Sequence, residues 1–165
     1  MSTTIKDTIK HISRTVSAFP SSVVADFPDL GNAGFIDAAK VGGARLPLGA
    51  LVGQSRVFEI DLDGAQPNAL QLGQGVPRAF NFDAVVRVRY DAQGAAVQDE
   101  VKSQALREQM VIAKAINASN WPAVSGLVTL NANPGTIQSG SAVDDAGNEY
   151  DFVLAEVQLG ISVDI

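Results

Sequence analysis

The sequence predicts an α+β fold, in which a mixed, mainly antiparallel sheet packs against one long and one short helix. Two stretches carry apolar residues at helical spacing, and several others alternate apolar and polar residues as half-buried strands do. Residues 20–56 are rich in glycine, which disfavours both a helix and a central strand. A chain of 165 residues is near the common size of one domain, so residues 1–165 are expected to form a single domain with residues 20–56 as a glycine-rich arm or long loop.

Residues 4–16 are predicted to form the short helix. Its apolar positions recur every three or four residues, at Ile5, Ile9, Ile12 and Val16. Such a stripe must be buried against another element. Thr4 and Asp7 have the spacing of a capping box, which places the start of the helix near Thr4. Phe19 followed by Pro20 predicts its end.

Two long strands are predicted before the second helix, at residues 56–63 and 80–90. In the first, Phe58, Ile60 and Leu62 share one face. In the second, the inward positions are Phe80, Phe82, Ala84, Val86, Val88 and Tyr90. The outward positions are Asn81, Asp83, Arg87 and Arg89. Residues 64–78 contain prolines and glycines and are predicted to form a loop, and residues 23–27 are a short strand candidate inside the glycine-rich arm.

The long helix is predicted at residues 97–118. Asp99 and Glu100 fall in its first turn, where the helix dipole favours acids. Its apolar face is expected to consist of Val101, Ala105, Leu106, Met110, Ile112, Ala113 and Ile116. Trp121 follows the helix and is expected to close one end of the core.

The last part of the chain predicts three more strands, at residues 126–132, 136–143 and 150–165. The run Asp-Asp-Ala-Gly-Asn at residues 144–148 is typical of a tight hairpin turn between the last two strands. In the closing strand, apolar and polar residues alternate as in a half-buried strand. These strands complete the predicted sheet.

Acidic residues outnumber basic ones and concentrate toward the end of the chain. Eighteen acids against twelve bases give a net charge of -6, and no Lys or Arg follows Lys114. A nucleic-acid-binding surface needs clustered bases, so sequence-specific DNA recognition is not expected. The absence of cysteine excludes disulfides and thiolate metal sites. No apolar run is long enough for a membrane span, so no membrane partner is expected.

No catalytic, cofactor-binding or metal-binding residue is predicted. His11 is the only histidine, so a Ser-His-acid triad would have to use it. Its position on a short helix beside Lys10 and Arg14 favours a solvated surface residue. We therefore expect a protein that is not an enzyme.

Two acidic stretches and one glycine pair resemble ligand-binding loops only in part. Residues 61–64 would start a calcium loop whose twelfth position holds Leu72 in place of a carboxylate, and residues 144–149 are too few to supply enough oxygens. Both stretches are interpreted as turns. Gly73 and Gly75 lack the third glycine of a dinucleotide-binding loop.

Arg87 and Arg89 lie on one predicted strand face together with Asp83. Opposite charges on neighbouring strands commonly pair across a sheet. We expect these side chains to form cross-strand ion pairs, with an ion pair across an interface between chains as the alternative.

The order of elements resembles that of the tail terminator proteins of long-tailed bacteriophages. A short helix is followed by a glycine-rich arm, two alternating strands, a long amphipathic helix and the closing strands. The runs that carry the resemblance lie on either side of the long helix: FNFDAVVRVRY at residues 80–90 and YDFVLAEVQLGISV at residues 150–163. One departure is that residues 20–70 are longer and richer in glycine than the compact pattern of that family.

The resemblance implies a structural virion protein without catalytic residues or cofactors. Members of this family form a hexameric ring that caps the finished tail tube, stops its polymerisation and joins the tail to the head. The implied location is the head–tail junction of the virion, after assembly in the host cytoplasm. The implied partners are further copies of the chain, the tail tube protein and a head-completion or connector protein.

The resemblance also implies that genomic DNA passes through the ring without specific binding. Carboxylates on the wall of the opening would repel the phosphates of that DNA. The stretch after Lys114, which has no bases, is expected to supply them, with residues 144–151 facing the opening.

The same sequence leaves other functions open. A tail tube or head-completion subunit of the same virion is one alternative; tube subunits stack into open filaments, whereas a terminator stops at a closed ring. A monomeric ligand-binding α+β module is another, with the glycine-rich arm as a lid and a stability that rises on ligand addition. An enzyme that uses scattered carboxylates has the least support, because no pair of acids has a spacing that forces the two together.

Overall fold

The computed structural model describes residues 3–18, 35–38, 56–62, 68–69, 79–93 and 95–164. Two helices, one short 3-10 helix and six strands are found in these ranges. In chain order they are α1 (Thr3–Ser17), β1 (Ile36–Asp37), β2 (Val57–Asp61), β3 (Asn68–Ala69), β4 (Ala79–Asp91), α2 (Ala95–Ala118), η5 (Trp121–Ala123), β5 (Leu127–Val143) and β6 (Glu149–Asp164).

The strands form one sheet in the order β1-β2-β4-β6-β5, with β3 paired to β4. β1 runs parallel to β2, and the other pairs are antiparallel. The long central pair extends from Ala79 opposite Asp164 to Asp91 opposite Phe152. The predicted mixed, mainly antiparallel sheet is therefore confirmed.

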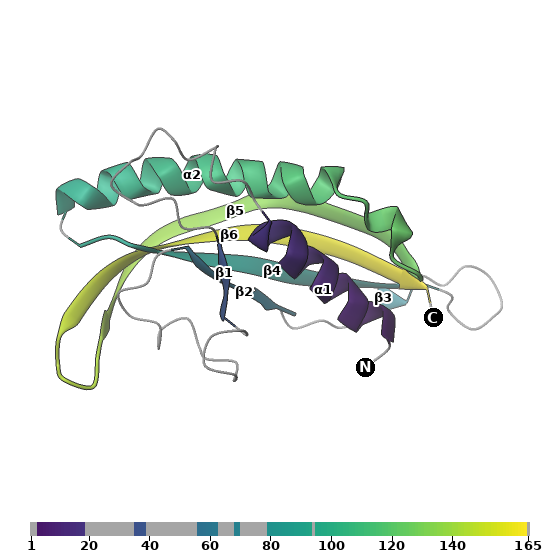
Figure 1. The fold of residues 1–165 in the computed structure, drawn as a ribbon, viewed down its shortest axis with the longest axis horizontal. Coiled ribbons are helices and arrows are strands. Elements are labelled where there is room, and N and C mark those ends of the chain that lie inside the picture. The colour runs from purple at the N-terminus through teal and green to yellow at the C-terminus, as the bar shows by residue number, and fades with distance from the viewer. Residues whose placement is uncertain are drawn as a thin grey trace.

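One face of the sheet packs against both helices, and α2 runs along β5 and β6 (Figure 1). A single apolar cluster contains Ile12 and Val16 of α1, Val101 and Ile112 of α2, and the residues of β4 and β6 that alternate toward the helices. From β4 these are Phe82, Ala84, Val86, Val88 and Tyr90, and from β6 they are Val153, Ala155, Val157, Leu159, Ile161 and Val163. Because two-residue alternation puts these side chains on one face, the predicted packing of one long and one short helix on the sheet is confirmed.

The predicted strands 126–132 and 136–143 are one strand, β5. The run from Asn133 to Gly135 predicted a break, but β5 continues through it with a shift in register between Pro134 and Ile137. β5 pairs only with β6 within the described sheet, and a proline and an irregularity are tolerated on an edge strand because no inner ladder bond is lost there.

Two short strands lie where the sequence predicts loops. Ile36 and Asp37 form β1 within the glycine-rich arm, and Asn68 and Ala69 form β3 within the predicted loop 64–78. Two residues carry too little periodicity to predict a strand. The strand candidate 23–27, the pair Gly73 and Gly75, and most of the arm 20–56 lie outside the described residues.

Three details of the predicted helices are wrong. α2 begins at Ala95 and has no acid in its first turn, so Asp99 and Glu100 lie in its second turn. α1 begins at Thr3, so Thr4 lies in the first turn and does not cap the helix. On α2, Leu106 and Met110 are 52% and 57% exposed, although both were expected on the apolar face. Met110 lies nine residues after Val101, about 180° around a helix with 3.6 residues per turn, so the two side chains point in opposite directions.

Candidate functional site

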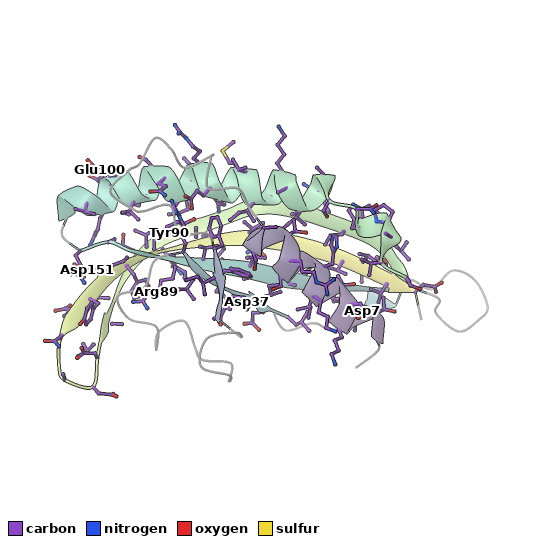
Figure 2. The ribbon with its side chains drawn as sticks, in the orientation of Figure 1. Asp7, Asp37, Arg89, Tyr90, Glu100 and Asp151 are labelled. Atoms are coloured by element: carbon purple, nitrogen blue, oxygen red, sulfur yellow. The ribbon has the colours of Figure 1, made fainter. Side chains whose placement is uncertain are left out.

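A buried polar cluster joins α2 to the sheet. Glu108 of α2 is 1% exposed, and its Oε1 accepts hydrogen bonds from Gln104 Nε2 at 2.7 Å and from Arg56 Nε at 3.2 Å. Its Oε2 accepts a hydrogen bond from the Tyr90 hydroxyl at 2.7 Å. Figure 2 shows Tyr90 extending from β4 toward α2. The carboxylate is thus surrounded by donors inside the core, as a buried charge requires.

Arg56 links this cluster to the edge of the sheet. Its φ of 57° is in the left-handed region, which a residue with a side chain rarely adopts. Its guanidinium lies over the ring of Phe35, 6.0 Å from the centroid, and its carbonyl accepts a hydrogen bond from the Ile36 amide at 2.9 Å. Arg56 therefore holds β1, β2 and α2 together.

The cluster pairs a carboxylate with a neutral donor and a cation. Burial, and then the charge of Glu108, raise the pKa of Tyr90 well above its ordinary value. The tyrosine therefore remains a neutral donor to the carboxylate, and Arg56 supplies the balancing positive charge at 3.1 Å from Oε1. Such an ion pair fixes the position of one element on another.

The buried cluster could have been predicted from two polar residues on the apolar stripe of α2. Gln104 and Glu108 follow Val101 by three and seven residues, so they fall on the stripe that Ala105 and Ile112 also occupy. Two polar residues in a buried stripe need partners from the sheet. Leu106 and Met110 were instead assigned to that stripe because of their apolar character.

His11 is half-buried rather than solvated. Its Nε2 lies 2.8 Å from Ser119 Oγ, and this hydroxyl donates its own hydrogen bond to the Ile116 carbonyl at 2.6 Å. The imidazole is therefore the donor to the serine, the reverse of the direction in which a histidine activates a serine nucleophile. Burial, and then the charge of Arg14, lower the pKa of His11. The contact ties α1 to the residue that follows α2.

The two strand arginines differ from each other. Arg87 pairs with Asp61 of β2 at 2.8 Å and with Glu156 of β6 at 3.1 Å. Cross-strand ion pairing is confirmed for Arg87, although its partners are these acids rather than Asp83. Arg89 was expected to face solvent but is 1% exposed.

Of the two calcium-like stretches, 144–149 is fully described, whereas residues 63 and 64 of the first lie outside the described residues. The Asp61 carboxylate is occupied by Arg87, and Asp144 starts a turn, as predicted. Among the described residues, no group of three or more His, Cys, Asp or Glu side chains is placed to hold a metal ion.

The end of the β5–β6 hairpin extends past the sheet. β4 ends at Asp91, opposite Phe152, and Gly140 is the partner of Phe152 on β5. Residues 141–151, which we call the tip segment, lie beyond this point, and none of them is buried. Figure 1 shows the hairpin curving away from the sheet and from both helices. The tip segment thus projects beyond the sheet and the two helices (Figure 1).

An aromatic stack fixes the base of the tip segment. The Arg89 guanidinium lies over the Phe152 ring, 4.9 Å from its centroid. A Cβ added to Gly140, opposite Phe152, would lie 2.6 Å from the ring carbon Cζ. The ring therefore lies directly on the backbone of Gly140, and the cation covers it. This stack orients the hairpin relative to β4.

The turn of the tip segment is held by one carboxylate. Asp144 Oδ1 accepts hydrogen bonds from the amides of Ala146 at 2.9 Å and Asn148 at 2.8 Å, and Oδ2 accepts one from Asn148 Nδ2 at 3.0 Å. Gly147 has a φ of 84°, which a side chain would disfavour. The hydrogen bonds from Asn148 are the main cause of a lowered pKa of Asp144. The turn is therefore a formed structure rather than a loose loop end.

The tip segment carries only negative charges. It contains Asp144, Asp145, Glu149 and Asp151 and no Lys or Arg. Asp145 and Glu149 are exposed. Only Asp144 is used to hold the turn, so the other three carboxylates are available to a partner.

No helix among the described residues is long and apolar enough to cross a membrane. No protein-family model matches the chain, and no curated protein matches it in sequence. The described structure by itself defines an α+β protein with one helix-covered sheet face and an anchored, acidic, two-stranded projection.

Proposed function

We propose that this chain is a structural subunit of a long-tailed bacteriophage virion, a tail terminator whose ring caps the tail tube, stops its polymerisation and joins the tail to the head. The observation that carries the proposal is the tip segment, an ordered projection that buries none of its residues in its own chain. A two-stranded hairpin is marginally stable by itself in water. A projection of this kind gains stability from contact with another chain.

The fold gives further support. The described elements keep the order on which the resemblance to that family rests, namely a short helix, strands, a long helix and closing strands. The buried cluster around Glu108 and the contact of His11 with Ser119 hold both helices on the sheet. A subunit that assembles by rigid surfaces needs such internal fixation, because ordering the surface on binding would reduce the affinity.

The proposed assembly is a hexamer of this chain at the head–tail junction. Its other partners are the tail tube protein on one side and a head-completion or connector protein on the other. Genomic DNA passes through the opening of the ring without specific binding. The protein acts by shape and contact and catalyses no reaction.

The experiment that tests the proposal is the mass of the purified protein by light scattering at several concentrations and two salt levels, followed by electron microscopy after adding tail tubes. We expect a discrete hexamer, or a monomer that becomes a closed six-membered ring on the tube end. Open filaments would assign the chain to the tail tube instead. A strict monomer that ignores tubes would overturn the proposal in favour of a ligand-binding module.

A further inference from the structure

One helix of the protein carries a row of exposed bases. Lys6, Lys10 and Arg14 of α1 are spaced four residues apart, so they share one face of the helix, and all three are exposed. Asp7 is the only acid on α1. None of these three bases forms an ion pair with another described residue. The basic row, as we call these three residues, is thus available to an acidic partner.

The tip segment presents acids on one of its faces. Glu149 and Asp151 are two residues apart on β6 and so point to the same side, where their β5 partners are Val143 and Ser141. Val143 is 65% exposed. The acidic face, as we call these four residues, therefore combines two carboxylates with one exposed apolar side chain.

The two surfaces match in spacing as well as in charge. Two residues along a strand advance by about 6.7 Å. Four residues along an α-helix advance by about 6 Å. Glu149 and Asp151 can therefore meet two successive bases of the basic row at once. Val143 then lies against the apolar stems of the lysines, which long basic side chains commonly offer beside their charged ends.

These surfaces cannot meet within one molecule. Figure 2 shows Asp151 of the tip segment and Asp7 of α1 toward opposite ends of the long axis of the protein. A contact between the two surfaces must therefore join two copies of the chain, with the acidic face of one copy against the basic row of the next. Such a head-to-tail contact repeats from copy to copy and closes into a ring when the rotation permits it.

We propose that the acidic face of the tip segment docks on the basic row of α1 in a neighbouring copy of this chain. The inference rests on the proposed ring and names the contact between its subunits. It replaces the expectation that residues 144–151 face the opening of the ring. Opposite charges steer the two surfaces together and set their register.

The basic row fits the acidic face better than the bases of α2 do. Arg107 and Lys114 are exposed on α2, but they lie seven residues apart, and the exposed acids Asp99 and Glu100 share that helix. Two bases separated by about 10 Å, at 1.5 Å per residue, do not match carboxylates two strand residues apart. α2 therefore supplies the matched control.

The test uses charge reversal on each surface of the full chain. The tip variant is Glu149→Lys with Asp151→Lys, the row variant is Lys6→Glu with Lys10→Glu, and the control is Arg107→Glu with Lys114→Glu. Association is measured by light scattering and native mass spectrometry at low salt. Circular dichroism checks that each variant folds. We expect the tip and row variants each to associate at least tenfold more weakly than the wild type, and the control to associate like it.

Mixing the two variants gives the sharper result. The tip variant has two basic surfaces and the row variant has two acidic ones, so neither binds itself but each binds the other. An equimolar mixture is expected to restore the association in alternating order. Because alternation closes only in rings of even number, a mixed six-membered ring with three copies of each variant is the expected product. Raised salt should weaken the wild type and the mixture alike.

Several outcomes would overturn the contact. The first is association of the tip variant as strong as that of the wild type, and the second is a loss of association confined to the α2 control. The third is a pair of folded variants that fail to restore association when mixed. The fourth is a wild type that stays monomeric at low salt both alone and with tail tubes. If the wild type caps tail tubes while the tip variant does too, this inference is wrong and the terminator function stands. If mixing restores association but no variant or wild type recognises tubes, the contact is right and the terminator function is wrong.

Discussion

Two carboxylates of this protein have similar hydrogen bonding and opposite surroundings. Glu108 accepts bonds from Gln104, Arg56 and Tyr90 while only 1% exposed. Asp144 accepts bonds from the amides and the side chain of its own turn at the protein surface. A donor lost in the core leaves a stranded partner, whereas water replaces a donor lost at the surface. The comparison separates the region that holds the fold from the region that is free to meet another chain.

The largest loss of stability is expected from removing Glu108, the buried carboxylate. Glu108→Ala removes the carboxylate that lies 3.1 Å from the guanidinium of Arg56, a residue that is only 1% exposed. We expect a loss of about 3–5 kcal/mol in the free energy of unfolding, the usual range for removing one partner of a buried ion pair. Urea denaturation followed by circular dichroism measures it.

A control for this experiment lies further along the same helix. Lys114 is exposed on α2, and Lys114→Ala is expected to change the free energy of unfolding by no more than about 0.5 kcal/mol. If Glu108→Ala were as mild as this control, the buried cluster would not be what fixes α2 on the sheet.

A smaller effect is expected at the base of the tip segment. In Gly140→Ala the new methyl would lie 2.6 Å from Phe152 Cζ, so the ring must leave its place beneath Arg89. We expect a loss of about 1–3 kcal/mol, the common range for overpacking. Urea denaturation measures the loss, and amide hydrogen exchange should show faster exchange within the tip segment.

Gly160→Ala on β6 is the matched control for this change. A Cβ at Gly160 would meet nothing within 4 Å. This substitution should be neutral or stabilise the protein by up to about 1 kcal/mol, because alanine restricts the unfolded chain. Equal losses for the two alanine variants would show that Phe152 does not depend on the glycine opposite it.

The smallest loss of stability is expected at the turn around Asp144. Its dependence on pH distinguishes this exposed carboxylate from the buried Glu108. The pKa of Asp144 lies below its ordinary value of 3.8, so the folded turn favours the ionised carboxylate. Its stabilisation is complete above that ordinary value and is lost as the pH falls through the lower folded pKa. Nuclear magnetic resonance of the Gly147 and Asn148 amides should show the turn loosening only in that acidic range.

Two variants test this assignment. Asp144→Ala should loosen the turn at every pH, with a change in overall stability that is small compared with the two effects above. Asp145→Ala removes a neighbouring exposed acid that holds no amide of the turn, and it should leave the Gly147 and Asn148 signals in place. An Asp144 that titrates at or above 3.8 would contradict the hydrogen bonding described for the turn.

Alternation and helical spacing were enough to predict the long elements. Strand β4, helix α2 and the turn after Val143 lie close to where the apolar pattern and the turn residues place them. The interior of β5 was not predictable, since Pro134 and Gly135 are loop signals everywhere except on an edge strand. β5 is an edge strand because, in the described sheet, it pairs with β6 and with no other strand. Strand pairing joins residues that are far apart in the sequence, so local patterns do not predict it.

The roles of Arg89 and Asn117 were also not predictable, because both depend on contacts with residues distant in the sequence. Arg89 has the polar character of a surface residue, yet it is buried and stacks on Phe152 of the neighbouring strand. Asn117 looks like an ordinary helix end, yet its side chain bonds both the amide and the carbonyl of Ala132, each at 2.8 Å. These two bonds cover part of the outer side of β5, where no further strand is described.

The sequence by itself determined the fold class, helix α2, strands β4 and β6, and the excess of acids after Lys114, because these depend on local periodicity and composition. The tertiary structure decided that Glu108 is a buried anchor, that Glu149 and Asp151 lie beyond the end of β4, and that they are remote from α1 (Figure 2). Those facts depend on strand register and on helix packing, which bring together residues that the sequence keeps apart.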